Sequence, residues 1–147
     1  MAKFKFRLQA VLNLKEKVEE LRKNEFGKAQ AMLEAEKQKK AMLVKDMDDA
    51  VHGFKQSITK GIDPLNIKRY NYFIENTKNK ILKQEKEIEK ARQLAEEKQA
   101  QLVEAMRDKK TLDILKENDF EEHIIEEKQS EQKIIDEIVS YRGSKNR

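Results

Sequence analysis

The helical pattern of this chain is strongly interrupted at one place, Gly61-Ile62-Asp63-Pro64. Glycine commonly ends a helix because it adopts a left-handed conformation without strain. Aspartate is a preferred cap at the start of a helix, and proline is favoured in its first turn. The four residues therefore combine the end of one helix with the start of another. The elements predicted from this break are a helix over about residues 6–59, a turn at 60–63, a second helix over about residues 64–142 and a frayed tail at 143–147.

Apolar residues follow the break at a strict spacing of seven. The series is Ile67, Ile74, Ile81, Ile88, Ala95 and Leu102. Residues at this spacing form a stripe on one face of a helix that supercoils around a partner helix. The stripe predicts the all-α fold class, as a long antiparallel two-helix coiled-coil hairpin whose second helix is longer than the first. Residues 1–147 would form a single hairpin domain, and Gly143 would cap the second helix.

The stripe on the first helix is less regular. Leu14, Val18 and Leu21 keep heptad spacing, and the pattern resumes near Leu43. Between them the best continuation passes through Glu25 in steps of four residues, which is a stutter that locally unwinds a left-handed supercoil. We therefore expect an irregular region in the middle of the first helix.

A turn centred near residue 61 places Ile81 near Ala41 and Leu112 near Ala10, and leaves no partner beyond Phe120. The overhanging helix is acidic, because the stretch 117–137 contains nine acidic and two basic residues. Its apolar residues are Phe120, Ile124, Ile125, Ile134, Ile135, Ile138 and Val139. A bare apolar stripe is costly in water, so the helix bends back, or the chain dimerises, or this end inserts into a cavity of a partner.

Composition limits the other functions that the chain can have. The 147 residues are 37% hydrophobic and 41% charged, which favours a thin coiled coil over a thick core. The chain has no cysteine, and no stretch resembles a signal peptide or a membrane span. We therefore expect a soluble, unprocessed, cytoplasmic protein without direct membrane insertion. The net charge of +4 comes from interleaved signs, which is weak support for nucleic-acid binding.

Residues suited to chemistry are scattered. His52 and His123 are the only histidines, and the predicted register keeps them far apart. The four glycines do not form a phosphate-binding loop, and a thin two-helix rod offers no dry pocket that would raise the pKa of a carboxyl group. We expect no catalytic residues, no metal site and no cofactor, and hence no enzyme.

Two short motifs carry a family resemblance. The amino terminus reads Phe-Lys-Phe-Arg-Leu-Gln from Phe4 to Gln9, and a Phe73-Ile74 pair follows the turn. With these motifs, its length and its two helices, the chain resembles the flagellar FliJ family over nearly all of its residues. The resemblance implies a component of the flagellar type III export apparatus, cytoplasmic and peripheral at the base of the flagellum. It also implies three partners: the hexameric export ATPase, the cytoplasmic domain of the membrane export gate, and export chaperones.

The resemblance implies that the hairpin, like the central stalk of rotary ATPases, inserts its two termini into the ATPase ring and promotes ring assembly and activity. The residues expected to bind the ring are Phe4, Phe6, Arg7, Leu8, Phe120, Ile124 and Ile138. The residues expected to dock on the export gate are Leu43, Tyr70, Tyr72 and Phe73. The family's gate face also includes positions corresponding to Thr77 and Gln84, although both lie on the predicted seam between the helices.

Aromatic residues gather near the turn, and their role is left open. At about 100° per residue, Tyr70 and Phe73 share a side of the helix while Tyr72 points away. The cluster therefore either caps the end of the hairpin or forms a docking patch.

Two other functions are compatible with the sequence. One is a generic structural coiled-coil adaptor or stalk of another assembly. The other is a nucleic-acid-associated coiled coil that uses the basic residues at the two ends, Lys3, Lys5, Arg7, Arg142, Lys145 and Arg147. A homodimer in isolation also stays open, because the bare stripe can pair with a second copy.

Overall fold

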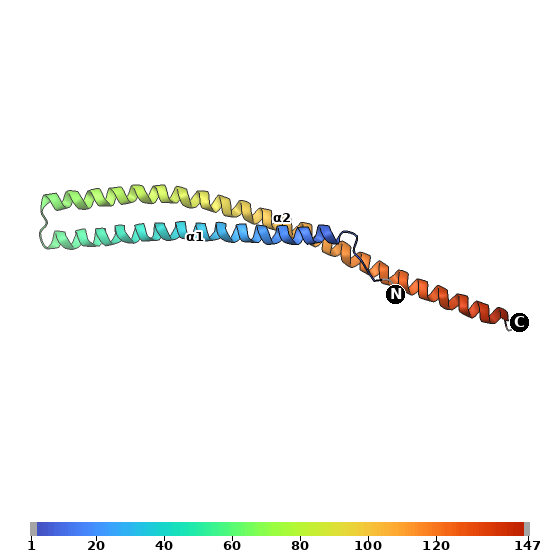
Figure 1. Ribbon diagram of the computed structural model, residues 1–147. Helices are drawn as coiled ribbons and strands as arrows, with labels where there is room; N and C mark the ends of the chain where they lie inside the picture. The colour runs from blue at the N-terminus through green and yellow to red at the C-terminus, as the bar shows by residue number, and fades with distance from the viewer. Residues whose placement is uncertain (1–2, 146–147) are drawn as a thin grey trace. The chain divides into compact units, whose positions relative to one another are not determined.

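The computed structural model describes residues 3–145 as two long helices (Figure 1). The first, α1, comprises Gln9–Thr59, and the second, α2, comprises Pro64–Lys145. The prediction of an all-α hairpin with a longer second helix is confirmed. The chain divides into two units, which are described separately: unit 1 contains Met1–Glu20 and Val103–Arg147, and unit 2 contains Leu21–Leu102.

The turn in unit 2 has the geometry that its sequence predicts. Gly61 has a φ of 82° in the left-handed region, and its amide donates a hydrogen bond to the carbonyl of Ile58 at 3.2 Å. The Asp63 carboxylate accepts a bond from the Leu65 amide at 3.4 Å, and α2 begins at Pro64. Glycine therefore ends α1, and aspartate caps the helix that proline starts.

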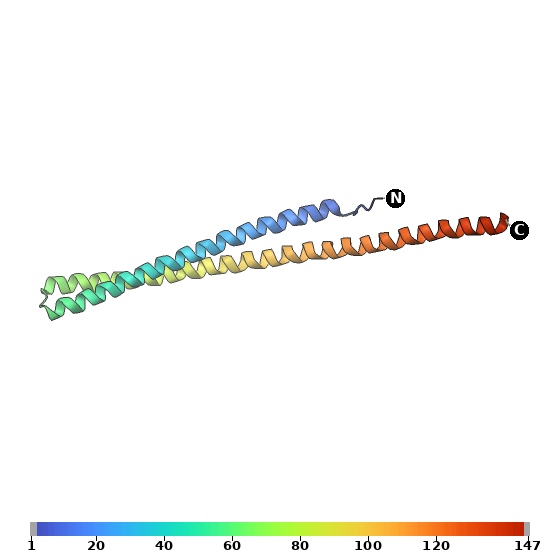
Figure 2. The same cartoon turned by 90° about the horizontal axis from the view of Figure 1, so that it is seen from below.

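In unit 2 the helices run side by side and antiparallel, as both ribbon views show (Figures 1 and 2). The predicted stripe of α2 faces α1: Ile67, Ile74, Ile81 and Ile88 are half-buried, and Ala95 and Leu102 are buried. Ala29 and Ala91 are also buried. Small side chains at these positions allow the two helix axes to approach closely.

The predicted stripe at the start of α1 is wrong at Leu14 and Leu21, although Val18 is half-buried. Leu14 and Leu21 are 58% and 54% exposed, whereas Leu12 is only 2% exposed. The residues of α1 that are buried or half-buried at heptad spacing are Leu12, Lys15, Glu19, Arg22, Phe26, Ala29, Leu33, Glu36 and Lys40. This series continues without a stutter, so the predicted irregular region is absent from α1.

Charged residues occupy the seam because their aliphatic stems cover apolar surface while their charged ends find partners across it. In unit 1 the Lys15 ammonium lies 3.7 Å from Asp108, and Lys109 lies 3.7 Å from Glu19. In unit 2 the Arg22 guanidinium donates to the Gln101 side chain at 3.2 Å. The pairs Lys15–Asp108 and Arg22–Gln101 agree to within one residue with the register predicted from the turn, whereas Lys109 reaches Glu19 from six residues further along α2.

Both outer helix boundaries differ from the prediction. Helix α1 begins at Gln9 instead of residue 6, because the Gln9 amide closes a turn onto the Phe6 carbonyl and Phe6 itself is buried outside the helix. Helix α2 continues to Lys145, so Gly143 lies within it and is not its cap. Arg142 and Lys145 in the last turn favour this extension through the helix dipole. The rest of the predicted frayed tail, 146–147, lies outside the described residues.

Candidate functional site

Residues 3–8 of unit 1 form a non-helical segment, here called the strap, that packs on α2. The Phe4 ring meets the Phe120 ring nearly edge-on, with 5.2 Å between centroids, and lies 5.5 Å from the His123 ring. Phe6 is buried at 7% exposure, Leu8 is half-buried and Arg7 is exposed. The strap therefore turns its apolar side chains inward, and Phe120 has a partner within the chain that the sequence did not predict.

Opposite charges face each other where the strap meets α2. A shallow hollow there is lined by Lys3, Lys5 and Arg7 on the strap and by Asp119, Glu122 and Glu126 on α2. Attraction between these groups favours the packed strap. Both charge clusters are visible in the sequence, where attraction within the chain is one explanation for their opposite signs and a cationic partner surface is the other.

The end of α2 carries a bare apolar surface. Every described residue from 131 to 145 is exposed. The tail stripe, as we name it, consists of Ile134, Ile135, Ile138 and Val139, which are 50–62% exposed. Of the other expected ring-binding residues, Ile124 is half-buried and Phe120 is 44% exposed. Ile138 lies 14 residues beyond Ile124, or about 21 Å along the helix. The expected ring-binding residues thus form two groups, one at the strap and one on the tail stripe.

The aromatic residues near the turn in unit 2 have two different environments. Tyr70 is half-buried, its ring lies 5.5 Å from that of Phe54, and its hydroxyl approaches Gly53. Tyr72 is 75% exposed and Phe73 is 44% exposed. Tyr70 therefore packs the end of the hairpin, while Tyr72 and Phe73 are accessible to a partner.

An open groove of 850 Å³ lies on one side of the turn. Tyr70 and Phe73 line it together, as their helical spacing predicts, and Tyr72 does not. Lys60 and Arg69 also line the groove and were missed by the sequence analysis. The signal that could have found them is the group of basic residues close to the glycine-bearing turn in the sequence.

The remaining residues of the expected gate face lie away from this groove. Leu43 is half-buried and does not line the groove. Thr77 is only 3% exposed. The Gln84 side chain donates to the backbone carbonyl of Glu36 at 2.9 Å and to the Glu36 carboxylate. Thr77 and Gln84 therefore hold the two helices together, which resolves the conflict seen in the sequence in favour of the seam.

Polar residues within the seam of unit 2 are ionised and paired. The hydrogen bond from Gln84, with a smaller contribution from Lys39, lowers the pKa of the Glu36 carboxyl group. The Arg22 guanidinium, at 3.0 Å, lowers the pKa of Glu25, and the Lys98 ammonium at 3.8 Å acts in the same direction. Both carboxyl groups therefore stay charged near neutral pH and are poor proton donors.

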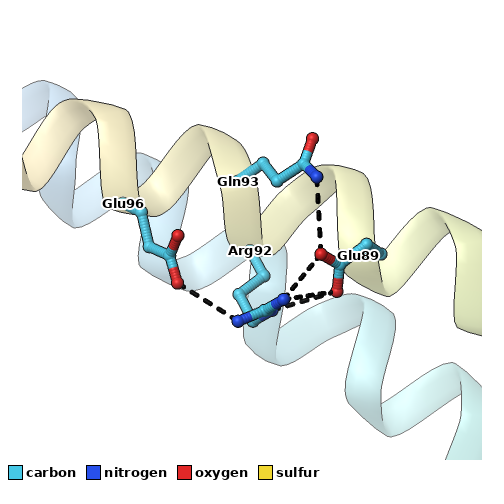
Figure 3. Close-up of polar contacts among 4 residues, drawn as sticks. All are labelled: Glu89, Arg92, Gln93 and Glu96. Atoms are coloured by element: carbon cyan, nitrogen blue, oxygen red, sulfur yellow. Dashed lines mark hydrogen bonds and ion pairs between the residues drawn. The ribbon is translucent and has the colours of Figure 1, made fainter.

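A second charge cluster covers the outer face of α2 (Figure 3). Arg92 donates two hydrogen bonds from Nη2 and one from Nε to Glu89, and it also reaches Glu96 at 3.2 Å. These contacts lower the pKa of Glu89 and raise that of Arg92. All four residues in Figure 3 belong to one exposed helix face, so the cluster stabilises the helix locally and encloses no ligand site.

No group of three or more histidine, cysteine, aspartate or glutamate residues within 3–145 is arranged to hold a metal ion. Over the same residues, neither helix has a run that is long and apolar enough to cross a membrane. The candidate binding surfaces are the strap with the tail stripe in unit 1 and the turn region in unit 2.

Comparison with known proteins gives one result. The model of a protein family described as "Flagellar FliJ protein" matches residues 4–147, which is nearly the whole chain. No curated protein matches the sequence, and no solved structure matches it either.

Proposed function

This chain belongs to the flagellar FliJ family, and on that premise we propose how it acts as a component of the flagellar protein export apparatus. It inserts as a stalk-like coiled coil into the hexameric export ATPase and promotes assembly and activity of the ring. It also contacts the cytoplasmic domain of the export gate and the export chaperones, in the cytoplasm at the base of the flagellum. The family match over residues 4–147 is the observation that carries this proposal.

The ring-binding surface comprises the strap and the end of α2. Its residues are Phe4, Phe6, Arg7, Leu8, Phe120, Ile124 and Ile138. The bare tail stripe supports this assignment, because four exposed β-branched side chains on one short helical stretch gain free energy when a pore wall covers them. The aromatic rings of Phe4 and Phe6 pack the strap, and this packing positions Arg7 and Leu8.

The tail stripe allows a test that does not disturb the fold. We expect the double variant Ile134→Ser and Ile138→Ser to remain helical and to bind the purified export ATPase at least about tenfold more weakly. Stimulation of ATP hydrolysis should fall with it. Met32→Ser with Leu82→Ser, which alters two side chains of similar exposure in unit 2, is the matched control and should stimulate normally.

Full stimulation by the tail variant would remove the tail stripe from the ring-binding surface. If the unaltered chain neither binds nor stimulates the cognate ATPase, the generic coiled-coil adaptor becomes the better assignment. Phe6→Ala is a poor substitute for this test, because Phe6 is buried and the strap would loosen.

The gate-docking surface is centred on Tyr72 and Phe73 and also includes Leu43 and Tyr70. Exposed aromatic side chains are favoured anchors in protein interfaces, which supports this assignment. The double variant Tyr72→Ala and Phe73→Ala should lose binding to the purified cytoplasmic domain of the gate, while Leu82→Ala should keep it. Unchanged binding of the aromatic variant would contradict the assignment.

A further inference from the structure

Four basic side chains surround the turn in unit 2 without acidic partners. We define the hairpin tip as residues 55–72, whose basic residues are Lys55, Lys60, Lys68 and Arg69. All four are exposed, and none of the ion pairs or side-chain hydrogen bonds found within residues 3–145 involves their side chains. The single acidic residue of the tip, Asp63, caps α2 through the Leu65 amide. The hairpin tip therefore presents unpaired positive charge.

The hairpin tip also contains exposed apolar side chains. Ile58 at the end of α1 is 52% exposed, and Leu65 at the start of α2 is 55% exposed. Leu65, Arg69 and Tyr72 follow at spacings of four and three residues, so they share one face of α2. Nothing within residues 3–145 covers this face, since Tyr72 is 75% exposed. The hairpin tip thus exposes both basic and apolar side chains.

We propose that the hairpin tip binds the surface of an anionic lipid bilayer. Lys55, Lys60, Lys68 and Arg69 attract acidic headgroups, and Ile58, Leu65 and Tyr72 enter the interface between headgroups and acyl chains. Tyrosine suits this boundary because its ring is apolar and its hydroxyl is polar. The proposal is independent of ATPase binding, since no residue of the strap or the tail stripe takes part. It shares Tyr72 with the proposed gate-docking surface, so the test variants leave Tyr72 unchanged.

The arrangement of the charges favours a bilayer over an acidic protein partner. The chain reverses direction at the turn (Figure 1), and the cations come from the end of α1, the turn and the start of α2. A folded protein partner would need a surface that matches all three segments at once to reach the four cations. In a fluid bilayer, anionic headgroups can contact all four cations at the same time, since the lipids rearrange around the inserted side chains.

Electrostatics sets the size of the expected effect. Each basic side chain close to an anionic surface strengthens binding about fivefold at physiological salt, and this gain declines as salt screens it. With a net charge of +3 over residues 55–72, the hairpin tip should prefer anionic over neutral vesicles roughly a hundredfold.

Sedimentation with vesicles tests the proposal on the full chain. We expect binding to vesicles of phosphatidylcholine with about one-third phosphatidylglycerol, and little binding to phosphatidylcholine alone. The variant Lys60→Glu with Arg69→Glu should weaken binding at least about 25-fold. The control Lys83→Glu with Lys86→Glu has the same net charge on exposed positions of α2 remote from the hairpin tip, and it should lose much less.

The apolar contribution has its own variant. Ile58→Ser with Leu65→Ser keeps all charges and should lower the binding that persists at high salt, whereas Met32→Ser with Leu82→Ser should not. Circular dichroism verifies that each variant is helical. Stimulation of the ATPase should be unchanged in all four, so failure of this proposal is distinguishable from failure of the proposed function.

Three results would overturn the proposal. One is the absence of binding to anionic vesicles. Another is an equal loss in the charge-reversed tip variant and its control, which would indicate attraction by net charge alone. The third is normal vesicle binding by a tip variant that no longer binds the gate's cytoplasmic domain, which would make the hairpin tip a protein-docking surface.

Discussion

Leu12 and Leu14 lie two positions apart on α1, and the structure gives them opposite environments. Leu12 is 2% exposed and Leu14 is 58% exposed. Leu12→Ala should lower the free energy of unfolding by at least about 2 kcal/mol, because it removes buried methyl groups and leaves a cavity. Leu14→Ala should change it by less than about 0.5 kcal/mol. Urea denaturation followed by circular dichroism measures both values.

This pair of substitutions also tests the seam of α1 directly. Heptad spacing of Leu14, Val18 and Leu21 predicted the opposite result, with Leu14 in the core. A larger loss of stability for Leu14→Ala than for Leu12→Ala would restore that seam and contradict the packing described here.

The buried positions at the start of α1 were predicted wrongly for a physical reason. Periodicity identifies apolar positions, but the true seam contains Lys15, Glu19 and Arg22, whose stems are apolar and whose charges are not. The stripe of α2 from Ile67 to Leu102 contains no charged residue and was predicted correctly. Cross-helix pairs such as Lys15 with Asp108 depend on the register, which one helix alone does not reveal.

Glu36 provides a prediction about pH. Its pKa is lowered from 4.5 in the folded chain, chiefly by the hydrogen bond from Gln84. A lowered pKa contributes stability that is present above about pH 4.5 and is lost as the pH falls through the lower, folded value. The thermal midpoint of the unaltered chain should therefore fall as the pH drops below about 5.

Glu36→Gln is the variant that isolates this effect. It should reduce the fall in thermal midpoint on acidification, because the amide does not titrate. Glu34→Gln removes an exposed carboxyl group for which no seam contact exists among the described residues, and its pH dependence should match that of the unaltered chain. Identical pH profiles for Glu36→Gln and Glu34→Gln would show that the Gln84 contact does not act as described.

At the scale of the helices, the same substitution should have opposite signs at two glycines. Gly27 lies inside α1, and a Cβ atom there would meet nothing within 4 Å. Gly27→Ala should therefore stabilise the chain by about 0.5–1 kcal/mol through helix propensity. Gly61 has a φ of 82°, so Gly61→Ala should destabilise it by about 1 kcal/mol. Thermal unfolding compares the two, and stabilisation by Gly61→Ala would contradict the left-handed turn.

The helices also show how far local signals extend. Gly61, Asp63 and Pro64 determine the turn through their own backbone preferences, which is why the end of α1 and the start of α2 were predicted correctly. The start of α1 depends instead on Phe4 and Phe6 packing against α2 across more than 100 residues of sequence. A contact of that separation leaves no periodic signal, so residues 6–8 of the strap were predicted as helix.

At the scale of the whole molecule, the rest of the described chain covers some parts of α2 and leaves other parts exposed. Helix α2 has a partner along most of its length, and residues 131–145 have none. The sequence predicted this overhang from the unequal lengths of the helices. It did not predict that the strap would cover part of it, and the assignment of the surface to the ATPase ring remains a prediction.

A truncation after Ser130 separates the stability of the chain from its proposed activity. Because residues 131–145 are all exposed, their removal should change the free energy of unfolding, measured by urea denaturation, by less than about 0.5 kcal/mol. Removal of the tail stripe should nevertheless abolish stimulation of the export ATPase. Analytical ultracentrifugation of both forms serves as the control. The full-length chain could prove to be a dimer that becomes a monomer on truncation, with a lower urea midpoint. This result would mean that the tail stripe pairs two copies of the chain. The ring-binding role of Ile138 would then have to be abandoned.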